Sequence, residues 1–489
     1  MSHQAPSFRF ATFAAVALVI VTGAALQSQV AISRDIAYFI YNNARMLAGQ
    51  QVVGADAPLY FTGLMVSNFI LYAPVSALVA MGVNAQAALF TYVFAMFAPA
   101  GLALYRHYSQ TGRQPLAMAM TSALAVMAFV FPIDMFGQRE HFFFLLLVPY
   151  AVYMMKRLDG PDAAFASPAV IACTVLAILI KPHFVFAPAA AEIVAAWREG
   201  KWRAPFNRVV LAIAITSSAY YGWALSTMAS DPNRQLAVQL NQAYFYHPFS
   251  EMIFRKYSLL WVGTAGAWMT ARLFRRTDFG TDLWPILWLG ALGAALVQQK
   301  GVDYHFLPAT AFALLASVHA AGVSPPGRRR TATALLVAAF IVLAGWRGQT
   351  KLRDEHAALN QIRQLEAAVL RHAGDRPFLL VSTDHWPLYP ILVRTGLIYA
   401  SRFNTFWFID SLAAVEARRG PVEGSVHRAL EQAVVEDFQR YRPRLAVLRR
   451  DEEPELTRFL TNPPISGLLA RYREVEDVDG FRFLIAEGD

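Results

Sequence analysis

The stretch Ser33-Arg-Asp-Ile-Ala-Tyr-Phe-Ile-Tyr-Asn-Asn-Ala-Arg-Met-Leu-Ala-Gly49 directly follows the first strongly apolar segment of the chain. Serine is a common residue just before a helix and glycine a common one just after it, so the stretch predicts a short amphipathic helix. Asp35 then lies in the first turn, where the helix dipole favours an ionised carboxylate. Asp35 either caps a surface helix or takes part in a reaction, and both interpretations are open at this point.

Helical spacing predicts which side chains of this helix share a face. The polar edge is expected to hold Asp35, Tyr38, Asn42 and Arg45. The apolar side is expected to lie against lipid or protein, and it holds Ile36, Phe39, Ile40 and Leu47.

The composition is typical of a polytopic membrane protein. Of the 489 residues, 56% are hydrophobic and only 16% are charged, and the mean hydropathy is +0.36. The net charge of +9 does not require a nucleic acid partner, because the basic residues gather in short loops. The single cysteine, Cys173, excludes an intramolecular disulfide.

The sequence predicts a mostly α fold, a polytopic bundle of about 11 transmembrane helices, since a bilayer core requires about 20 apolar residues per helix. The predicted spans are 10–30, 85–104, 116–133, 142–156, 167–181, 183–196, 208–228, 257–271, 283–298, 304–320 and 331–348. The apolar stretch 59–81 is interrupted by prolines and glycines, so we expect one or two interfacial helices there that do not cross.

Charge counting favours this topology. With an inner N-terminus, the inner loops carry about twice as many Lys and Arg residues as the outer loops, as the positive-inside rule requires. We therefore expect a transmembrane domain over 1–349 and a small extracytoplasmic α/β domain over 350–489. Strands are predicted at Phe378–Ser382, Leu445–Leu448 and Phe481–Ile485, and helices at 351–372, 411–418 and 425–440.

Besides Asp35, three clusters of ionisable residues are expected at the outer face: Asp134–His141, Lys181–His183 and Lys300–His305. In the first, Gln138-Arg-Glu-His141 precedes Phe142-Phe-Phe-Leu-Leu-Leu and so forms the first turn of a helix, where backbone N–H groups and a guanidinium create an anion site. Each cluster also has an ordinary alternative, namely a solvated interfacial loop or a snorkelling lysine. Together they suit a substrate with a phosphate at headgroup depth and a lipid tail.

Several familiar motifs are absent from the sequence: a Walker loop, His-Glu-x-x-His, a paired Cys-x-x-Cys, and the internal repeat of many transporters. Gly290 and Gly293 are expected to let helices approach closely.

The pattern resembles the GT-C superfamily of integral-membrane glycosyltransferases, especially the branch of protein O-mannosyltransferases and lipid A aminoarabinose transferases. The resemblance is carried by the first outer loop, from Asp35-Ile-Ala-Tyr38 to Leu47-Ala-Gly49, by Pro58 with an interfacial helix, and by the second acidic position, Asp134. It implies a polyprenyl-phosphate-linked sugar donor, inversion of the anomeric centre and Asp35 as the base. Many members have a second acidic residue beside the first-loop Asp, whereas Ile36 follows here, so a divalent cation as cofactor stays an open question.

We therefore expect a glycosyltransferase of the bacterial inner membrane whose site and C-terminal domain face the periplasm. Its acceptor is a hydroxyl of a glycolipid, a polysaccharide or a protein. The expected catalytic residues are Asp35, Asp134 and Glu140. The expected ligands of the donor phosphate are Arg139, His141, Lys181, His183, Lys300 and His305. The expected substrate-binding residues are Tyr38, Asn42, Gln138, Asp303 and Tyr304, and no metal ligand is predicted.

Two other functions stay open from the sequence. One is a transporter or flippase of a lipid-linked anionic glycan, and the other is an enzyme of the O-antigen ligase or polymerase type.

Overall fold

The computed structural model describes residues 6–49, 66–159, 167–200, 207–229, 248–253, 265, 279–323, 328–383, 386–403, 405–406, 408–419, 424–450 and 454–487. The chain divides into two compact units, each made of segments that are distant in sequence. Unit 1 contains Met1–Val30, Leu89–Tyr220 and Tyr246–Glu355, and unit 2 contains Ala31–Ala88, Tyr221–Phe245 and His356–Asp489. The predicted domain boundary at 349/350 lies within one continuous helix and stays a prediction.

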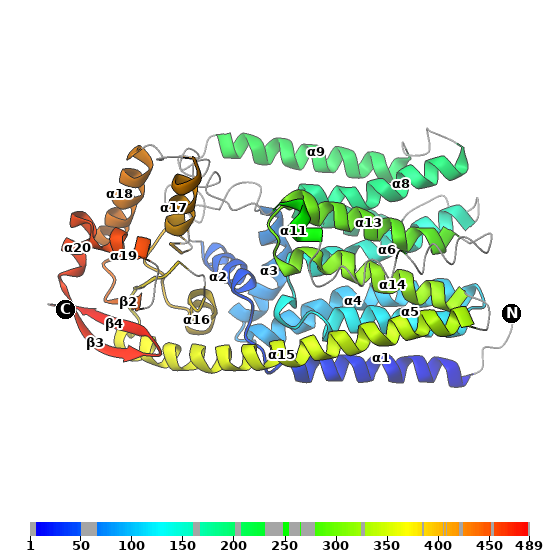
Figure 1. Ribbon diagram of the computed structural model, residues 1–489, viewed down its shortest axis with the longest axis horizontal. Coiled ribbons are helices and arrows are strands. Elements are labelled where there is room, and N and C mark those ends of the chain that lie inside the picture. The colour runs from blue at the N-terminus through cyan, green and yellow to red at the C-terminus, as the bar shows by residue number, and fades with distance from the viewer. Residues whose placement is uncertain are drawn as a thin grey trace. The chain divides into compact units, whose positions relative to one another are not determined.

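Unit 1 is a bundle of helices (Figure 1). Its elements are α1 (Pro6–Gln27), most of α4 (Ala85–Gln110), α5 (Gln114–Ala125), the π-helical turn η2 (Val126–Val130), η3 (Ile133–Met135), α6 (Arg139–Asp159), α7 (Pro168–Ile180), η4 (Pro182–Val185), α8 (Phe186–Glu199), the first part of α9 (Arg208–Ala229), α11 (Phe249–Ile253), α13 (Phe279–Gln298), η6 (Asp303–Phe306), α14 (Leu307–Val323) and the first part of α15 (Arg328–Ala373).

Within the described residues, five helices are long and apolar enough to cross a membrane: Phe10–Gln27, Ala85–Gln110, Arg139–Leu158, Val209–Thr227 and Asp303–Val323. Val66–Ala80, Gln114–Val130, Pro168–Ile180 and Asp282–Gln298 are shorter apolar helices. The predicted span 257–271 falls outside the described residues except for residue 265, and the other predicted spans lie on helices. The number of crossings and their direction stay predictions, as does the interfacial position of 59–81, of which α3 (Val66–Ala80) is described.

Helix α6 is largely buried within unit 1. Phe142, Phe143 and Phe144, which follow its first turn, are all fully buried. The ring of Phe143 stacks on Phe184 with the ring centroids 4.0 Å apart, and Phe144 meets Phe312 of α14 edge to face. A helix that is apolar on every side is stable only when it is enclosed. The run of aromatic residues therefore fixes α6, and with it the charged residues of its first turn.

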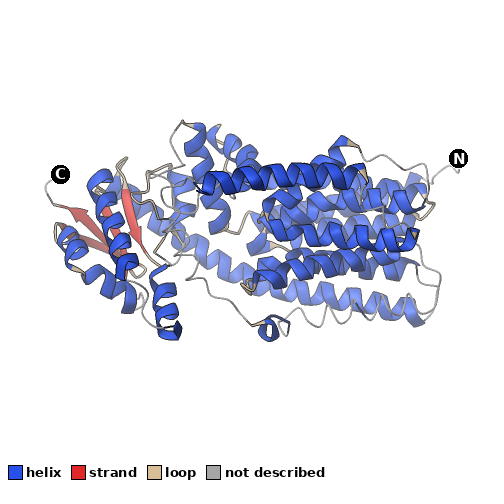
Figure 2. Cartoon of the chain, turned by 90° about the horizontal axis from the view of Figure 1, so that it is seen from above, coloured by secondary structure: helices blue, strands red, loops and turns tan. Residues whose placement is uncertain are grey.

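Unit 2 combines helices with one four-stranded sheet, which Figure 2 shows in red. Its elements are α2 (Arg34–Leu47), α3, the last part of α15, β1 (Phe378–Val381), α16 (Leu388–Thr395), α17 (Phe408–Arg419), α18 (Gly424–Tyr441), β2 (Leu445–Arg449), α19 (Pro454–Thr461), α20 (Pro463–Leu469), β3 (Tyr472–Val478) and β4 (Phe481–Ala486).

The strand order of the sheet is β1-β2-β4-β3, with β1 and β2 parallel and the other pairs antiparallel. Phe378 stands opposite Leu445 in the parallel pair. The three predicted strands and the three predicted helices are confirmed to within a few residues, except that 351–372 belongs to the longer helix α15. The prediction missed β3, a largely exposed edge strand in which charged residues dominate.

Of the two glycines expected at close helix contacts, one is confirmed. A Cβ at Gly290 of α13 would stand 2.5 Å from the Cα of Ala187 and 2.7 Å from the carbonyl oxygen of Phe186, both backbone atoms of α8. A Cβ at Gly293, one turn further on, would meet no described atom within 4 Å. Only Gly290 is therefore needed for the approach of the two helices.

This difference predicts opposite effects of the same substitution at neighbouring glycines. Gly290→Ala forces α8 and α13 apart and should destabilise the protein by about 1–3 kcal/mol. Gly293→Ala should leave the stability unchanged or raise it by up to about 1 kcal/mol, because alanine favours a helix over glycine. Thermal unfolding of the two detergent-purified variants measures the difference, and equal melting temperatures would contradict the packing described for Gly290.

Candidate functional site

The loop before α6 is built around a glycine and a histidine. Gly137 has a positive φ of 75° and a Cβ there would stand 2.7 Å from the Leu89 side chain, so the position requires glycine. Its backbone N–H donates to Nδ1 of His141, at 3.0 Å. Because Nδ1 accepts this hydrogen bond, a neutral His141 carries its proton on Nε2.

His141 was expected to bind the donor phosphate, but the structure places its ring among aromatic side chains. The ring is fully buried and lies near Phe136 and Phe142, with centroids 5.5 and 6.2 Å away. One ring nitrogen already accepts from the backbone of the loop. His141 thus supports the loop that leads into α6.

Glu140, which directly precedes His141, is the centre of a buried polar cluster in unit 1. Its Oε1 forms an ion pair with Nζ of Lys181 and lies 3.7 Å from Nε2 of His305. The Lys181 ammonium also donates to Oε1 of Gln298, at 3.1 Å. The Glu140 side chain is completely buried and that of Lys181 is 11% exposed. The structure therefore brings the three predicted clusters of this unit to one point.

Lys181 and Lys300 each lie in a short break between two helices. Helix α7 ends at Ile180, Lys181 has an extended backbone, and Pro182 begins the turn η4. Helix α13 ends at Gln298, and η6 begins five residues later at Asp303. Proline lacks the N–H that would continue a helix, and the left-handed Gly301 (φ 60°) turns the second connection. These breaks turn polar side chains inward at helix ends.

Aromatic rings cover the ammonium of Lys181. Its Nζ lies 5.9 Å from the ring centroid of Phe184 and 5.7 Å from that of Tyr304. Tyr304 in turn contacts the ring of His305 edge to face, at 4.5 Å. The negative faces of the rings stabilise the cation while they exclude water from it. Tyr304 was expected to bind substrate, and here it forms part of the wall around Lys181.

Two further cations, Arg139 and Lys300, lie near Lys181. Arg139 and Lys300 lie close enough to interact electrostatically with Lys181, His183 and His305. We define the cation cluster as Arg139, Lys181, His183, Lys300 and His305, together with the carboxylate of Glu140.

Several buried atoms of the cation cluster have no hydrogen-bond partner among the described residues. They are Oε2 of Glu140, Nδ1 of His305 and Nε2 of His183. A buried polar atom without a partner costs stability, about 1–3 kcal/mol and more when the group is charged. Such atoms in one cluster mark a place where water, an ion or a ligand can supply the missing donors and acceptors.

The other predicted residues of unit 1 lie around this cluster or apart from it. Asp134, expected to be catalytic, forms an ion pair with Lys351 of α15, at 3.6 Å and partly exposed. The carbonyl oxygen of Gln138 accepts from the N–H groups of His141 and Phe142 and so begins α6. Asp303 is half-buried at the start of η6, two residues before His305.

The predicted residues of the first loop belong to unit 2. The expected helix is confirmed as α2, with Asp35 half-buried in its first turn. The expected polar edge is wrong at Tyr38 and Asn42, because both are buried. The ring of Tyr38 contacts Tyr389 of α16 edge to face, and the side-chain amide of Asn42 donates to the Tyr38 carbonyl oxygen. On the apolar side, Ile36, Phe39 and Ile40 are buried as expected, whereas Leu47 is exposed.

Helix α3 covers one side of α2. The Phe39 ring stacks on Tyr72 with centroids 5.1 Å apart, and the side-chain amide of Asn43 donates to the carbonyl oxygen of Phe69 at 2.9 Å. With α3 and α16 both packed on it, α2 is covered by protein along Ile36–Asn43. This explains why Tyr38 and Asn42 are not exposed.

Sequence reasoning missed three residues that make important contacts: Gln298, Lys351 and Tyr41. Gln298 could have been found, because a glutamine at the end of an apolar helix has few reasons to be there except a polar partner. Lys351 and Tyr41 lie in ordinary amphipathic helices, and no local pattern marks them.

Metal binding has no support in the described part of the chain, where no three or more His, Cys, Asp or Glu side chains are grouped to hold an ion. No protein-family model matches the sequence, and no curated protein shows significant similarity to it.

The enclosure of Glu140 and Lys181 predicts strong coupling between them. Glu140→Ala leaves a buried ammonium without its carboxylate, and Lys181→Met leaves a buried carboxylate, so each change should cost about 3–5 kcal/mol. The double variant Glu140→Ala/Lys181→Met should cost less than the sum of the two, because neither charge remains. Unfolding of the four proteins in detergent measures this coupling, and strictly additive losses would contradict a buried ion pair.

Proposed function

We propose that this protein is a polytopic membrane glycosyltransferase that takes a sugar from a polyprenyl-phosphate-linked donor and transfers it to a hydroxyl of an extracytoplasmic acceptor. The cation cluster is proposed as the site of the donor phosphate. The proposal includes about 11 transmembrane helices and a periplasmic C-terminal domain. It is supported by the resemblance of the sequence to the GT-C superfamily and by the chemistry of the cation cluster.

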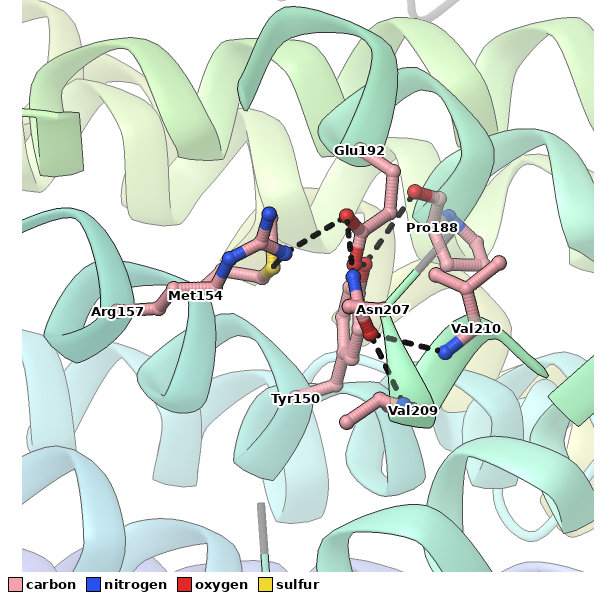
Figure 3. Close-up of polar contacts among 8 residues, drawn as sticks. All are labelled: Tyr150, Met154, Arg157, Pro188, Glu192, Asn207, Val209 and Val210. Atoms are coloured by element: carbon pink, nitrogen blue, oxygen red, sulfur yellow. Dashed lines mark hydrogen bonds and ion pairs between the residues drawn. The ribbon is translucent and has the colours of Figure 1, made fainter. Parts of the chain in front are cut away.

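The supporting observation is a comparison between two buried ion pairs that involve α6. Figure 3 shows the second of them, around Glu192 of α8. There Oε1 accepts from the Tyr150 hydroxyl at 2.9 Å, and Oε2 accepts from Arg157 at 2.8 Å and from Asn207 at 3.2 Å. Both oxygens are therefore satisfied within the protein, as in a purely structural ion pair.

At Glu140, by contrast, the hydrogen bonds of the carboxylate are incomplete. One carboxylate oxygen, Oε2, has no hydrogen-bond partner in the part of the chain that the structure describes. The Lys181 ammonium has three N–H donors, of which Glu140 and Gln298 accept two. A phosphate oxygen can accept the third, and a sugar hydroxyl can donate to Glu140.

The charges of the cluster suit a departing lipid phosphate. When the bond between the anomeric carbon and the phosphate oxygen breaks, the electron pair stays on the phosphate, whose negative charge increases. Arg139, Lys181 and Lys300 are three cations against the one carboxylate of Glu140, so the cation cluster has a net positive charge before a ligand binds, and the balance stays positive when Asp303, near His305 in the chain, is also counted. Fixed positive groups in a water-poor site stabilise such a developing anion more strongly than water does.

The acceptor half of the reaction is assigned to Asp35. It is proposed to take the proton of the acceptor hydroxyl, whose oxygen then forms the new bond to the anomeric carbon. This assignment rests on the resemblance and on the position of Asp35 in the first turn of α2.

Donor binding tests the phosphate site without knowledge of the acceptor. Lys181→Met should weaken binding of a radiolabelled polyprenyl-phosphate monosaccharide to the protein in liposomes about 10- to 100-fold, because a charge-assisted hydrogen bond is lost. Arg157→Met is the matched control, since Arg157 also pairs with a buried glutamate and is exposed to 12%, against 11% for Lys181. Equal donor affinity of the two variants would show that the phosphate binds elsewhere.

Transfer tests the base. Asp35→Asn keeps the size of the side chain and removes its basicity, so transfer of labelled sugar into membranes that contain the natural acceptors should fall at least about 100-fold. Donor binding should remain unchanged. Full transfer by Asp35→Asn would remove Asp35 from the mechanism.

A further inference from the structure

One hydroxyl group of α2 makes two hydrogen bonds to the C-terminal part of unit 2, residues 356–489. The Tyr41 hydroxyl donates to the carbonyl oxygen of Leu397 and accepts from the N–H of Tyr399, both at 3.1 Å. The tyrosine and its partners are 356 and 358 residues apart in the chain. All these groups are buried.

The two backbone groups belong to the edge of the sheet. Residues 397–400 run beside β1: the Phe378 N–H donates to the Ile398 carbonyl at 3.1 Å, and the Ala400 N–H donates to the Phe378 carbonyl at 2.9 Å. In an extended chain, successive backbone groups point to opposite sides. The Leu397 carbonyl and the Tyr399 N–H are therefore the groups on the side away from β1, where a further strand would bind.

The Tyr41 hydroxyl makes the two hydrogen bonds that the backbone of such a strand would make to Leu397 and Tyr399. A phenol both donates and accepts, so one oxygen satisfies a C=O and an N–H that an edge strand otherwise leaves open. Aromatic packing adds to this contact, because Tyr389 of α16 touches both Tyr38 and Tyr41 of α2, with ring centroids 5.0 and 6.0 Å apart. The C-terminal part of unit 2, His356–Asp489, which we call the C-terminal fold, thus contacts α2 at Tyr38 and Tyr41.

We propose that Tyr41 is a positioning residue, and that the C-terminal fold, through Tyr41, sets the place of Asp35 for the transfer reaction. Asp35 lies six residues before Tyr41 on the same rigid helix, so a shift of the helix moves the carboxylate with it. This role rests on the proposed function of Asp35. A catalytic base works only within hydrogen-bond reach of the proton it removes, so small displacements of α2 are costly.

Tyr41→Phe removes the hydroxyl and keeps the ring. The turnover number for transfer from a polyprenyl-phosphate monosaccharide into acceptor-containing membranes should fall about 10- to 100-fold, with the KM for the donor changed by less than about twofold. Amide hydrogen exchange of the full-length protein should become faster in 34–47 and in 397–400 together.

Tyr399→Phe is the matched control. Its hydroxyl is also buried in unit 2 and donates to a backbone carbonyl, that of Leu380, at 3.1 Å, within the C-terminal fold. Its backbone N–H still donates to Tyr41. This variant should lose transfer only in proportion to the fraction of unfolded protein, and exchange in 34–47 should stay slow.

The outcomes separate this proposal from the proposed function. Faster exchange in α2 together with a loss of turnover that is specific to Tyr41→Phe supports the positioning role. Unchanged exchange in α2 of Tyr41→Phe, or unchanged turnover while Asp35→Asn is inactive, overturns it. Full activity of Asp35→Asn overturns the catalytic assignment itself, and this is measured with Tyr41 in place.

Discussion

A carboxylate enclosed in an apolar helix bundle is stable only with a cation beside it, and Glu140 meets this condition through Lys181. The requirement links two separate parts of unit 1, because Glu140 lies in α6 whereas Lys181 lies in the break between α7 and η4, and the aromatic run after Glu140 fixes where α6 lies. The breaks at Lys181 and after Gln298 are needed to turn polar groups toward this carboxylate. The cost of burying charges thus explains why three distant segments end at one point.

The two buried ion pairs of α6 show how a structural cluster differs from a candidate binding site. Both consist of a glutamate and a cation with nearly equal exposure. Around Glu192, a tyrosine, an arginine and an asparagine complete the hydrogen bonds of both oxygens. At Glu140, the protein keeps one oxygen and two imidazole nitrogens without described partners, at a stability cost. Water, an ion or a ligand that supplies the missing hydrogen bonds removes this cost.

Much of this organisation could be predicted from the sequence. Apolar runs, prolines and glycines located the helices of unit 1, and the clustering of charges at the ends of apolar runs indicated Glu140, Lys181 and His305 before their contacts were known. Strand β3 could not be predicted, because an exposed edge strand rich in Arg, Glu and Asp lacks the apolar alternation of a half-buried strand. The roles of His141 and Asp134 could not be predicted either, since a hydrogen bond to Gly137 and an ion pair with Lys351 depend on tertiary contacts.

The burial of α2 shows the limit of pattern reasoning most clearly. An amphipathic pattern identifies a helix and its apolar face, but it contains no information about what covers the polar face. Tyr38 and Asn42 look like exposed residues from their spacing, yet both are buried, and Tyr389 of α16 lies against Tyr38 because residues more than 350 positions later fold beside α2. A tyrosine hydroxyl that completes the edge of a sheet is a tertiary interaction with no local signature. The contacts that join segments 31–88 and 356–489 in unit 2, among them the hydrogen bonds of Tyr41 with Leu397 and Tyr399, are therefore contained only in the three-dimensional structure.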